Sequence, residues 1–217
     1  MNKILLSTAY FPPLDYFATI LSADEITIEK HETYFKQSYR NRCHIATASG
    51  MQVLSIPVIK TDGNNTKITG IAPSKIENWQ RVHWKTIESA YSKTAYFIHY
   101  CDELEEILFR PYPGLLELND TILKKLLKFL RIDKPIFHSS DFEKQPSGFI
   151  DLRMRIHPKK DMLLPKHQYK TYFQAFSPKY EFIPNLSILD LLFAEGPHAV
   201  TYLQNMASEI RENRLIE

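Results

Sequence analysis

The densest group of side chains that could do chemistry lies in residues 29–44, directly after a short strand-like run. Arg40 and Arg42 flank Asn41, and a guanidinium group binds phosphate or carboxylate through two parallel hydrogen bonds. The residues of this segment that we expect to bind a ligand are Lys36, Tyr39, Arg40, Asn41 and Arg42. The pattern predicts a surface for an anionic small molecule. A salt-bridged β-ribbon with one solvated face would use the same residue types.

Two titratable groups at the ends of this segment could move a proton. His44 and Glu29 are the candidates for catalysis, because imidazole and carboxylate groups act as general acids and bases when their surroundings tune them. Glu29 and Glu32 could instead orient the neighbouring cations. Both roles stay open from the sequence alone.

The first loop, residues 7–16, is the second candidate surface. Ligands of open α/β sheets bind at the carboxyl ends of the strands, and a helix that starts there can hold an anion. The loop contains no glycine and two consecutive prolines, so its backbone cannot approach a phosphate as a glycine-rich loop does. If the loop is functional, Tyr10 and Tyr16 are the residues that would stack on a ligand ring. The alternative is a stiff structural turn.

The other histidines and the cysteines carry weaker signals. His83 lies beside Trp79 on an apolar helical face, where a histidine is either a ligand contact or a core residue with satisfied hydrogen bonds. Cys43 and Cys101 are too few for a disulfide framework or a zinc quartet. The chain has no HExxH, CxxC or GxSxG motif, so we predict no metal, no cofactor and no α/β-hydrolase chemistry.

Composition restricts the class of protein. The 217 residues include 44% hydrophobic and 24% charged side chains, and the net charge is only +2. These values are typical of a globular domain with one sizeable core and argue against a dedicated nucleic-acid binder. The first residues lack the long apolar stretch and the small-residue cleavage site typical of a signal peptide, and the sequence contains no apolar run of the roughly 20 residues that span a bilayer. We therefore predict one cytoplasmic domain over residues 1–217, with a disordered tail from about residue 211.

Short elements must position the candidate residues. Residues 3–10 and 25–29 resemble strands and enclose a short helix at 14–23, an order that opens a βαβ unit and indicates a partly parallel sheet. Residues 42–47 and 52–59 are predicted to form a hairpin, with Ser49 and Gly50 in its turn and Pro57 at an edge or bulge. Whether the first loop and the arginines meet in space stays open.

Helices follow the hairpin. Ser74 and Glu77 have the spacing of a capping box, which predicts a helix over residues 74–93 with Ile76 on its apolar face. The remaining predicted elements are an amphipathic helix at 115–132, a strand at 135–139, mostly loop over 141–186, a helix at 187–195 capped by Ser187 and Asp190, and a helix from Pro197 to Met206. The predicted fold class is mixed α/β, with packed helices around a partly parallel sheet and a hairpin.

Together these residues resemble the WbqC-like protein family. The resemblance rests on Tyr16-Phe17, residues 36–42, Gly50, residues 54–58, Trp79, His83-Trp84, Ala90-Tyr91, Tyr96-Phe97 and residues 185–192. It covers roughly residues 3–205, and its most specific parts are the Asn41-Arg42 pair and the run from Leu186 to Leu192. Many members carry His-Gln-Pro-x-Tyr-Leu-Pro-Trp in the first loop. Here the loop is one residue shorter and lacks that histidine and glutamine.

The resemblance implies a role in surface-polysaccharide or lipopolysaccharide O-antigen synthesis, without a catalytic assignment. It favours a transferase for an activated anionic sugar or related metabolite, in which Lys36, Arg40 and Arg42 neutralise developing charge. The alternative is a non-catalytic protein that binds a glycan intermediate or assembles with glycan-synthesis proteins. That alternative fits the lack of a recognisable nucleophile, metal set or glycine-rich loop. Neither interpretation involves nucleic acid or a membrane span.

Overall fold

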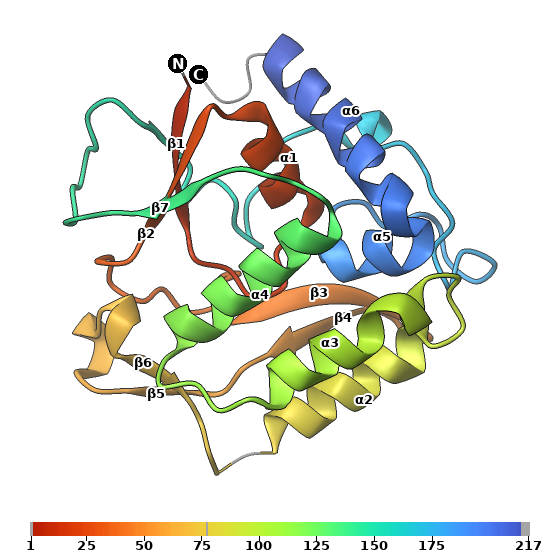
Figure 1. Cartoon of the computed structure of the whole chain (residues 1–217), viewed down its shortest axis with the longest axis horizontal. Helices are drawn as coiled ribbons and strands as arrows, with labels where there is room; N and C mark the ends of the chain where they lie inside the picture. The colour runs from red at the N-terminus through yellow and green to blue at the C-terminus, as the bar shows by residue number, and fades with distance from the viewer. Residues whose placement is uncertain (1, 77, 214–217) are drawn as a thin grey trace.

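The computed structural model describes residues 2–76 and 78–213 and has the predicted mixed α/β class. Figure 1 shows a parallel sheet, antiparallel hairpins below it in this view, and helices arranged around both. The buried apolar side chains of these parts form one continuous core. The sheet and the hairpins therefore share their packing rather than forming separate units.

The four-stranded sheet runs parallel at every pairing. Its strands in spatial order are β7 (Ile136–His138), β2 (Glu25–Glu29), β1 (Lys3–Ser7) and β8 (Ile150–Asp151). Helix α1 (Leu14–Ser22) connects β1 to β2, which confirms the predicted βαβ unit. Because the strands share one direction, their carboxyl ends meet at one edge of the sheet.

The two faces of this sheet are covered differently. On one face, α1 packs against the strands and α6 (Ala199–Glu212) covers α1 from outside (Figure 1). The strand residues that are fully buried are Ile4, Leu6, Ile26 and Ile28. The other face has a hollow of about 270 Å³, with Leu5, Thr27 and Phe137 in its wall. The side chains of neighbouring strand residues point to opposite faces, and both faces of β1 and β2 are buried, since Leu5 and Thr27 are only 4% and 5% exposed.

The predicted hairpin is present, but its second strand is shorter than expected. β3 (Arg42–Thr47) pairs with β4 (Gly50–Ser55), and Gly50 turns the chain with φ of 98°, a value that favours glycine. Pro57 ends the run, and the chain starts again as β5 (Val58–Lys60), which pairs with β6 (Ile71–Pro73). Between these two strands lie the short 3₁₀ turns η1 (Gly63–Asn65) and η2 (Ile68–Gly70).

The helix predicted from residue 74 begins later. α2 spans Trp79–Tyr91, and the Ser74 hydroxyl accepts from the Ile76 N–H at 3.3 Å in the turn before it. The Ser74 N–H is tied to the carbonyl of Pro57 at 2.7 Å, which holds residue 74 on the hairpin. Ile76 is therefore 92% exposed rather than on an apolar face. Glu77, the second member of the predicted capping box, lies outside the described residues.

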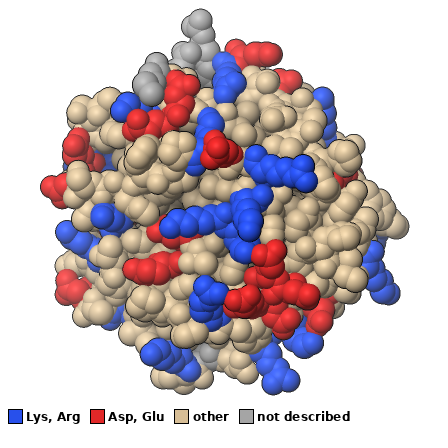
Figure 2. Space-filling model, in the orientation of Figure 1, with Lys and Arg blue, Asp and Glu red and all other residues tan. Residues whose placement is uncertain are grey.

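Two further helices follow α2. The first, α3 (Phe97–Phe109), was not predicted, and α4 (Leu115–Phe129) matches the predicted amphipathic helix. Lysine and arginine side chains gather over α4 in Figure 2, next to acidic side chains over α3. An ion pair joins Lys125 of α4 to Glu103 of α3. The cations of α4 therefore have acidic neighbours.

The carboxyl-terminal helices confirm one predicted cap and correct another. α5 (Ile188–Glu195) starts at Ser187, whose hydroxyl accepts from the Leu189 N–H. Asp190 does not cap this helix. It is buried, and it accepts hydrogen bonds from Tyr91 at 3.0 Å and Tyr172 at 2.7 Å. The residue that resembles a cap in the sequence is therefore a core carboxylate that links α5 to α2.

The last described helix extends just past residue 211, where the predicted tail begins. After η4 (Gly196–His198), α6 continues to Glu212, and Arg211 donates to the carbonyl oxygen of Ser22 at 3.1 Å. The remainder of the predicted tail, residues 214–217, lies outside the described residues. The predicted long loop of residues 141–186 contains only β8 and the 3₁₀ turn η3 (Lys166–Gln168). Among the described residues, no helix combines the length and apolar character that crossing a membrane requires.

Candidate functional site

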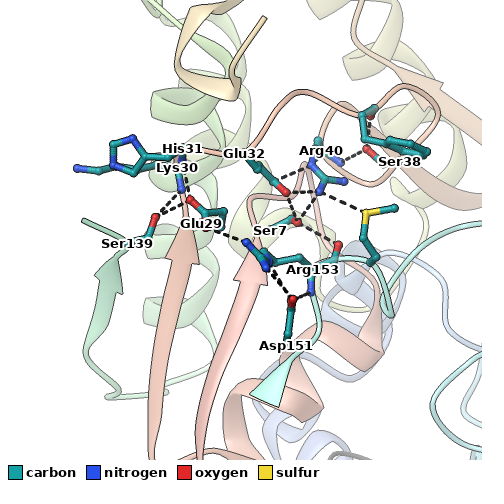
Figure 3. Close-up of polar contacts among 12 residues, drawn as sticks. Ser7, Glu29, Lys30, His31, Glu32, Ser38, Arg40, Ser139, Asp151 and Arg153 are labelled. Atoms are coloured by element: carbon teal, nitrogen blue, oxygen red, sulfur yellow. Dashed lines mark hydrogen bonds and ion pairs between the residues drawn. The ribbon is translucent and has the colours of Figure 1, made fainter. Parts of the chain in front are cut away.

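The carboxyl edge of the parallel sheet holds a network of buried charges, drawn in Figure 3. Arg40 donates to Glu32 from Nε at 2.8 Å and from Nη2 at 2.5 Å. The same Nη2 lies 2.6 Å from the hydroxyl of Ser7, the last residue of β1. The side chains of Arg40 and Glu32 are only 3% and 7% exposed. The first strand and the arginine cluster therefore meet in space.

A second arginine closes the same edge from the other side of Ser7 (Figure 3). Arg153 donates from Nη1 to Glu29, at the end of β2, at 3.0 Å, and from Nε and Nη2 to Asp151, at the end of β8, at 2.9 and 2.7 Å. The hydroxyl of Ser139, just after β7, donates to Glu29 at 2.7 Å. All four strand ends are thus linked by this network.

The carboxylates of the network are already engaged by its arginines and serines. Both oxygens of Glu29 are engaged, because the His31 N–H donates to Oε1 at 2.7 Å and Arg153 occupies Oε2. Arg40 directs two nitrogens at Glu32. A buried ion pair whose hydrogen bonds are satisfied contributes to the specificity of a fold and offers little to a solute. The sequence predicted ligand binding by Arg40 and proton transfer by Glu29; the structure places both in this closed network.

Beside the network lies a hollow of about 180 Å³, which we call the inner hollow. Its wall consists of residues 155–158, 160–162 and 184–186 together with Asp15, Tyr39, His44 and Met51. Tyr39 also lines a narrow gap that reaches Ser7 and Arg40. The inner hollow therefore opens next to the carboxyl end of β1, where open α/β sheets bind their ligands.

The wall of the inner hollow contains Asp15 and Asp161 as well as Arg155 and Lys160, and further cations act on its two histidines. Burial lowers the pKa of His157, and the charges of Arg40, Lys159, Lys160 and Arg42 lower it further. Burial followed by the charge of Arg42 likewise lowers the pKa of His44. Both imidazoles are therefore neutral at pH 7, in a field that attracts anions.

His157 presents a hydrogen-bond donor without an acceptor. Its Nδ1 accepts from the backbone N–H of Lys159 at 3.1 Å, so in the neutral ring the proton is on Nε2. Nε2 is buried and has no partner among the described residues. The Nε of Arg42 is in the same condition. Each unpaired buried donor carries a desolvation penalty. His31 Nε2 and the Tyr112 hydroxyl are also buried without a partner in the described part of the chain, and what distinguishes His157 is that it lines the inner hollow.

The opposite wall of the inner hollow is rigid. Asp15 is buried, and it accepts from the Leu163 N–H at 2.9 Å and from Asn185 Nδ2 at 2.8 Å. Burial raises the pKa of its carboxyl group. Arg155 fixes the loop above it by donating to the carbonyl oxygens of Asp161 and Met162. The ring of Tyr39 meets His44 edge-on at 5.5 Å.

A second, open hollow of about 510 Å³ lies on the other side of His157, and we call it the outer hollow. It is lined by Tyr34, Phe35, Lys36, Gln37, Lys60, Asn64 and Lys159. The ring of Phe35 lies 5.6 Å from that of His157, so one side chain from each hollow forms the partition between them. Lys36, a predicted ligand residue, lines this outer hollow and not the inner one.

Four predicted site residues lie inside the protein instead. The hydroxyl of Tyr10, a fully buried residue, pairs with Nδ1 of His83 at 2.9 Å, and burial lowers the pKa of His83 to about 4. Tyr16 donates to the carbonyl oxygen of Ser7 at 2.9 Å. Asn41 Nδ2 donates to the carbonyl of Ile56 at 2.8 Å. None of these side chains has an exposed face for a ligand, because each one fastens the first loop or the hairpin.

Sequence analysis missed the residues that the long loop contributes. Arg153, His157 and Lys160 lie in a stretch without hydrophobic period, where no motif marks them. Only the strand order could have indicated them, because side chains that follow the ends of parallel strands meet at one edge of the sheet. Cys43 is buried, and burial raises the pKa of its thiol, which argues against a reactive thiolate. Within residues 2–76 and 78–213, no three His, Cys, Asp or Glu side chains are placed to hold a metal ion.

Comparison with known proteins gives two matches. The model described as the WbqC-like protein family matches residues 8–161. The uncharacterized protein Rv1507c of Mycobacterium tuberculosis is 27% identical over 228 residues, which cover 94% of this chain and 98% of the relative. No solved structure matches the chain. The residues matched by the family include both the arginine segment and the loop that carries His157 and Lys160.

Proposed function

Because the chain belongs to the WbqC-like protein family, we propose that it is a group-transfer enzyme that binds an activated anionic sugar or a related metabolite in the inner hollow. The proposed pathway, cell-surface polysaccharide or O-antigen synthesis, rests on the family resemblance. The relative Rv1507c is itself uncharacterized and adds no substrate. The choice of an anionic ligand rests on the hollow.

The observation that carries the proposal is the unpaired Nε2–H of His157 among cations that lack a carboxylate partner. Arg42 and Lys160 form no ion pair with any described carboxylate, whereas the neighbouring Arg40 and Arg153 do. A phosphate or carboxylate oxygen in the inner hollow would give the Nε2–H of His157 the acceptor that it lacks. Charge-assisted hydrogen bonds of this kind are about twice as strong as neutral ones.

The same wall could support the transfer step. His44 is neutral, and its imidazole has no hydrogen-bond partner among the described residues. As the hydroxyl oxygen of the acceptor bonds to the transferred glycosyl or acyl carbon, its proton moves to the imidazole of His44. The bond from that carbon to the leaving phosphate oxygen breaks with its electron pair. Lys160 and Arg42 stabilise the negative charge that this oxygen gains.

A thermal-shift screen tests ligand binding. The purified protein is screened against orthophosphate, sugar phosphates, sugar nucleotides and acyl donors. A ligand at 100 times its Kd should stabilise the folded state by about 2.7 kcal/mol. Lys160→Ala should weaken binding about tenfold, which corresponds to one lost charged contact. Lys124→Ala is the matched control, because Lys124 is an equally exposed lysine on α4. The proposal fails if no ligand shifts the transition or if both variants behave alike.

A second candidate function is a non-catalytic binding or assembly protein of the same pathway. The observation in its favour is that the two predicted proton carriers do not form a pair. Glu29 accepts hydrogen bonds from Arg153 and Ser139. No described carboxylate forms a hydrogen bond with His44 that would orient its ring. Incubation of the protein with each stabilising ligand and a hydroxyl acceptor decides between the two functions. Product formation that is lost in His44→Ala supports the transferase, and binding without turnover supports the second candidate.

A further inference from the structure

The outer hollow is the second place where cations gather without carboxylates. Lys36, Lys60 and Lys159 contribute three ammonium groups, and no acidic residue lines the hollow. We propose that it binds a diphosphate group of the same ligand whose remaining part enters the inner hollow, a step that rests on the function proposed above. Three ammonium groups match the two to three negative charges of a diphosphate better than those of a single phosphate.

The lysines of the outer hollow are crowded together. Burial lowers the pKa of Lys60, and the charge of the nearby Lys36 lowers it further. Like charges this close repel each other, and no described carboxylate compensates them. The lysines of α4 differ, since Lys125 pairs with Glu103 there. A bound polyanion would supply the compensation that the outer hollow lacks.

The backbone that presents Lys36 is held in place before any ligand arrives. The N–H of Tyr34 donates to the carbonyl of Thr66 at 2.9 Å, and the hydroxyl of Ser38 donates to the carbonyl of Phe35 at 2.7 Å. Gln37, which lies between Phe35 and Ser38 in the sequence, has a backbone φ of 55°. Non-glycine residues adopt this conformation at an energetic cost, and such strain gathers at ligand sites.

A single ligand could reach both hollows. Lys159 lines the outer hollow and Lys160, the next residue, lines the inner one. The partition between them is the Phe35–His157 contact, with 5.6 Å between the ring centroids. Phe35 is 47% exposed, which leaves part of its ring available to an apolar or aromatic group. The inner hollow, at about 180 Å³, would take only part of a ligand, because complete ligand pockets usually have about 300–1,000 Å³.

Calorimetric titration of the whole protein with inorganic pyrophosphate and with orthophosphate tests the proposal. Pyrophosphate should bind at least tenfold more tightly. Lys36→Ala/Lys60→Ala should weaken pyrophosphate binding at least tenfold, while the control Lys124→Ala/Lys128→Ala, with the same loss of charge on exposed positions of α4, should leave it unchanged. Equal affinities for the two anions, or equal losses in the two double variants, overturn the proposal.

The inner-hollow variant separates this proposal from the proposed function. Lys160→Ala should leave affinity for pyrophosphate within about twofold while it weakens a ligand that fills both hollows. If pyrophosphate does not bind but another ligand binds and is lost in Lys160→Ala, the outer hollow fails and the proposed function stands. If pyrophosphate binds at the lysines but no ligand responds to Lys160→Ala, the proposed function fails and the outer hollow stands.

Two further arms identify the source of the diphosphate. In the first, a nucleoside diphosphate is titrated; in the second, the protein is sedimented with neutral phospholipid vesicles that contain a lipid diphosphate, or with the same vesicles without it. A soluble source predicts tighter binding of the nucleoside diphosphate than of pyrophosphate and no vesicle binding. A lipid source predicts sedimentation only with vesicles that contain the lipid diphosphate, weakened in Lys36→Ala/Lys60→Ala. Vesicle binding that this variant does not weaken, with no binding of either diphosphate, overturns the proposal.

Discussion

The segment of residues 29–44 supplies cations to two regions that are built in opposite ways. In the network at the strand ends, Arg40 is 2% exposed and is locked onto Glu32. In the outer hollow, Lys36 is exposed and faces other lysines instead of a carboxylate. Both regions lie beside His157, whose pKa is lowered first by burial and then by the charges of Arg40 in the first region and Lys159 in the second.

The difference between these regions separates stability from binding. Removing one partner of a closed, buried ion pair leaves a desolvated charge behind, so the protein depends on the pair for folding. An exposed group of like charges contributes nothing favourable to folding. A bound anion would compensate it. On this contrast rests our proposal that Arg40 serves folding and that Lys36, Lys60 and Lys160 bind ligand.

The largest expected effect comes from breaking the closed network. Glu32→Gln keeps the size of the side chain but leaves the charge of Arg40 buried without compensation, which should lower the free energy of unfolding by about 3–5 kcal/mol. Urea denaturation at pH 7 measures it. The matched control is Glu88→Gln, because Glu88 forms an exposed ion pair with Lys85 and should cost about 1 kcal/mol or less. Equal losses in the two variants would contradict the assignment of Arg40.

The next largest effect is on the pH dependence of stability, and it comes from the buried His83, which lies outside the inner hollow. His83 has a folded-state pKa of about 4 against an ordinary value of 6.5. Folding therefore favours the neutral ring. Its contribution to stability is complete above pH 6.5 and is lost as the pH falls to about 4, by about 3 kcal/mol. In His83→Gln this part of the acid destabilisation should disappear.

Urea denaturation at about pH 7 and about pH 4 checks this prediction. Gln can keep a hydrogen bond to the Tyr10 hydroxyl, so the variant should remain folded at neutral pH. His99→Gln is the control at an exposed position and should retain the pH dependence of the wild type. A wild-type slope in His83→Gln would show that other groups cause the acid destabilisation.

The fold was predictable where local chemistry determines it. The βαβ opening, the hairpin turn at Gly50 and the cap at Ser187 each follow from a few adjacent residues. Ser74 has the same capping signal, yet its contact with Pro57 moves the helix start to Trp79. The helix α3 was not predicted; it has no side-chain cap, but neither do α1 and α4, which were predicted. At Ser74, the local signal failed because a tertiary contact competes with it.

The site was predictable only in part. Glu32, which the sequence offered as a residue that orients a cation, pairs with Arg40 only eight residues away. Other partners in the network are distant in sequence. The partner of Glu29 is Arg153, which is 124 residues away. No spacing rule relates residues on different strands of a sheet. Residue types therefore indicated the chemistry, whereas topology decided which cations remained free.

The smallest expected effect on stability comes from the outer hollow, and it tests directly whether this region differs from the network at the strand ends. Lys36→Ala should change the free energy of unfolding by less than about 0.5 kcal/mol without ligand. Because the substitution relieves repulsion from Lys60, added salt should stabilise the wild type more than the variant. Urea denaturation at about 20 mM and about 300 mM salt measures this difference. Added pyrophosphate should raise the free energy of unfolding more in the wild type than in Lys36→Ala. If Lys36→Ala instead unfolded the protein without ligand, Lys36 would belong with Arg40 in the framework, and its exposed position would have a structural cause.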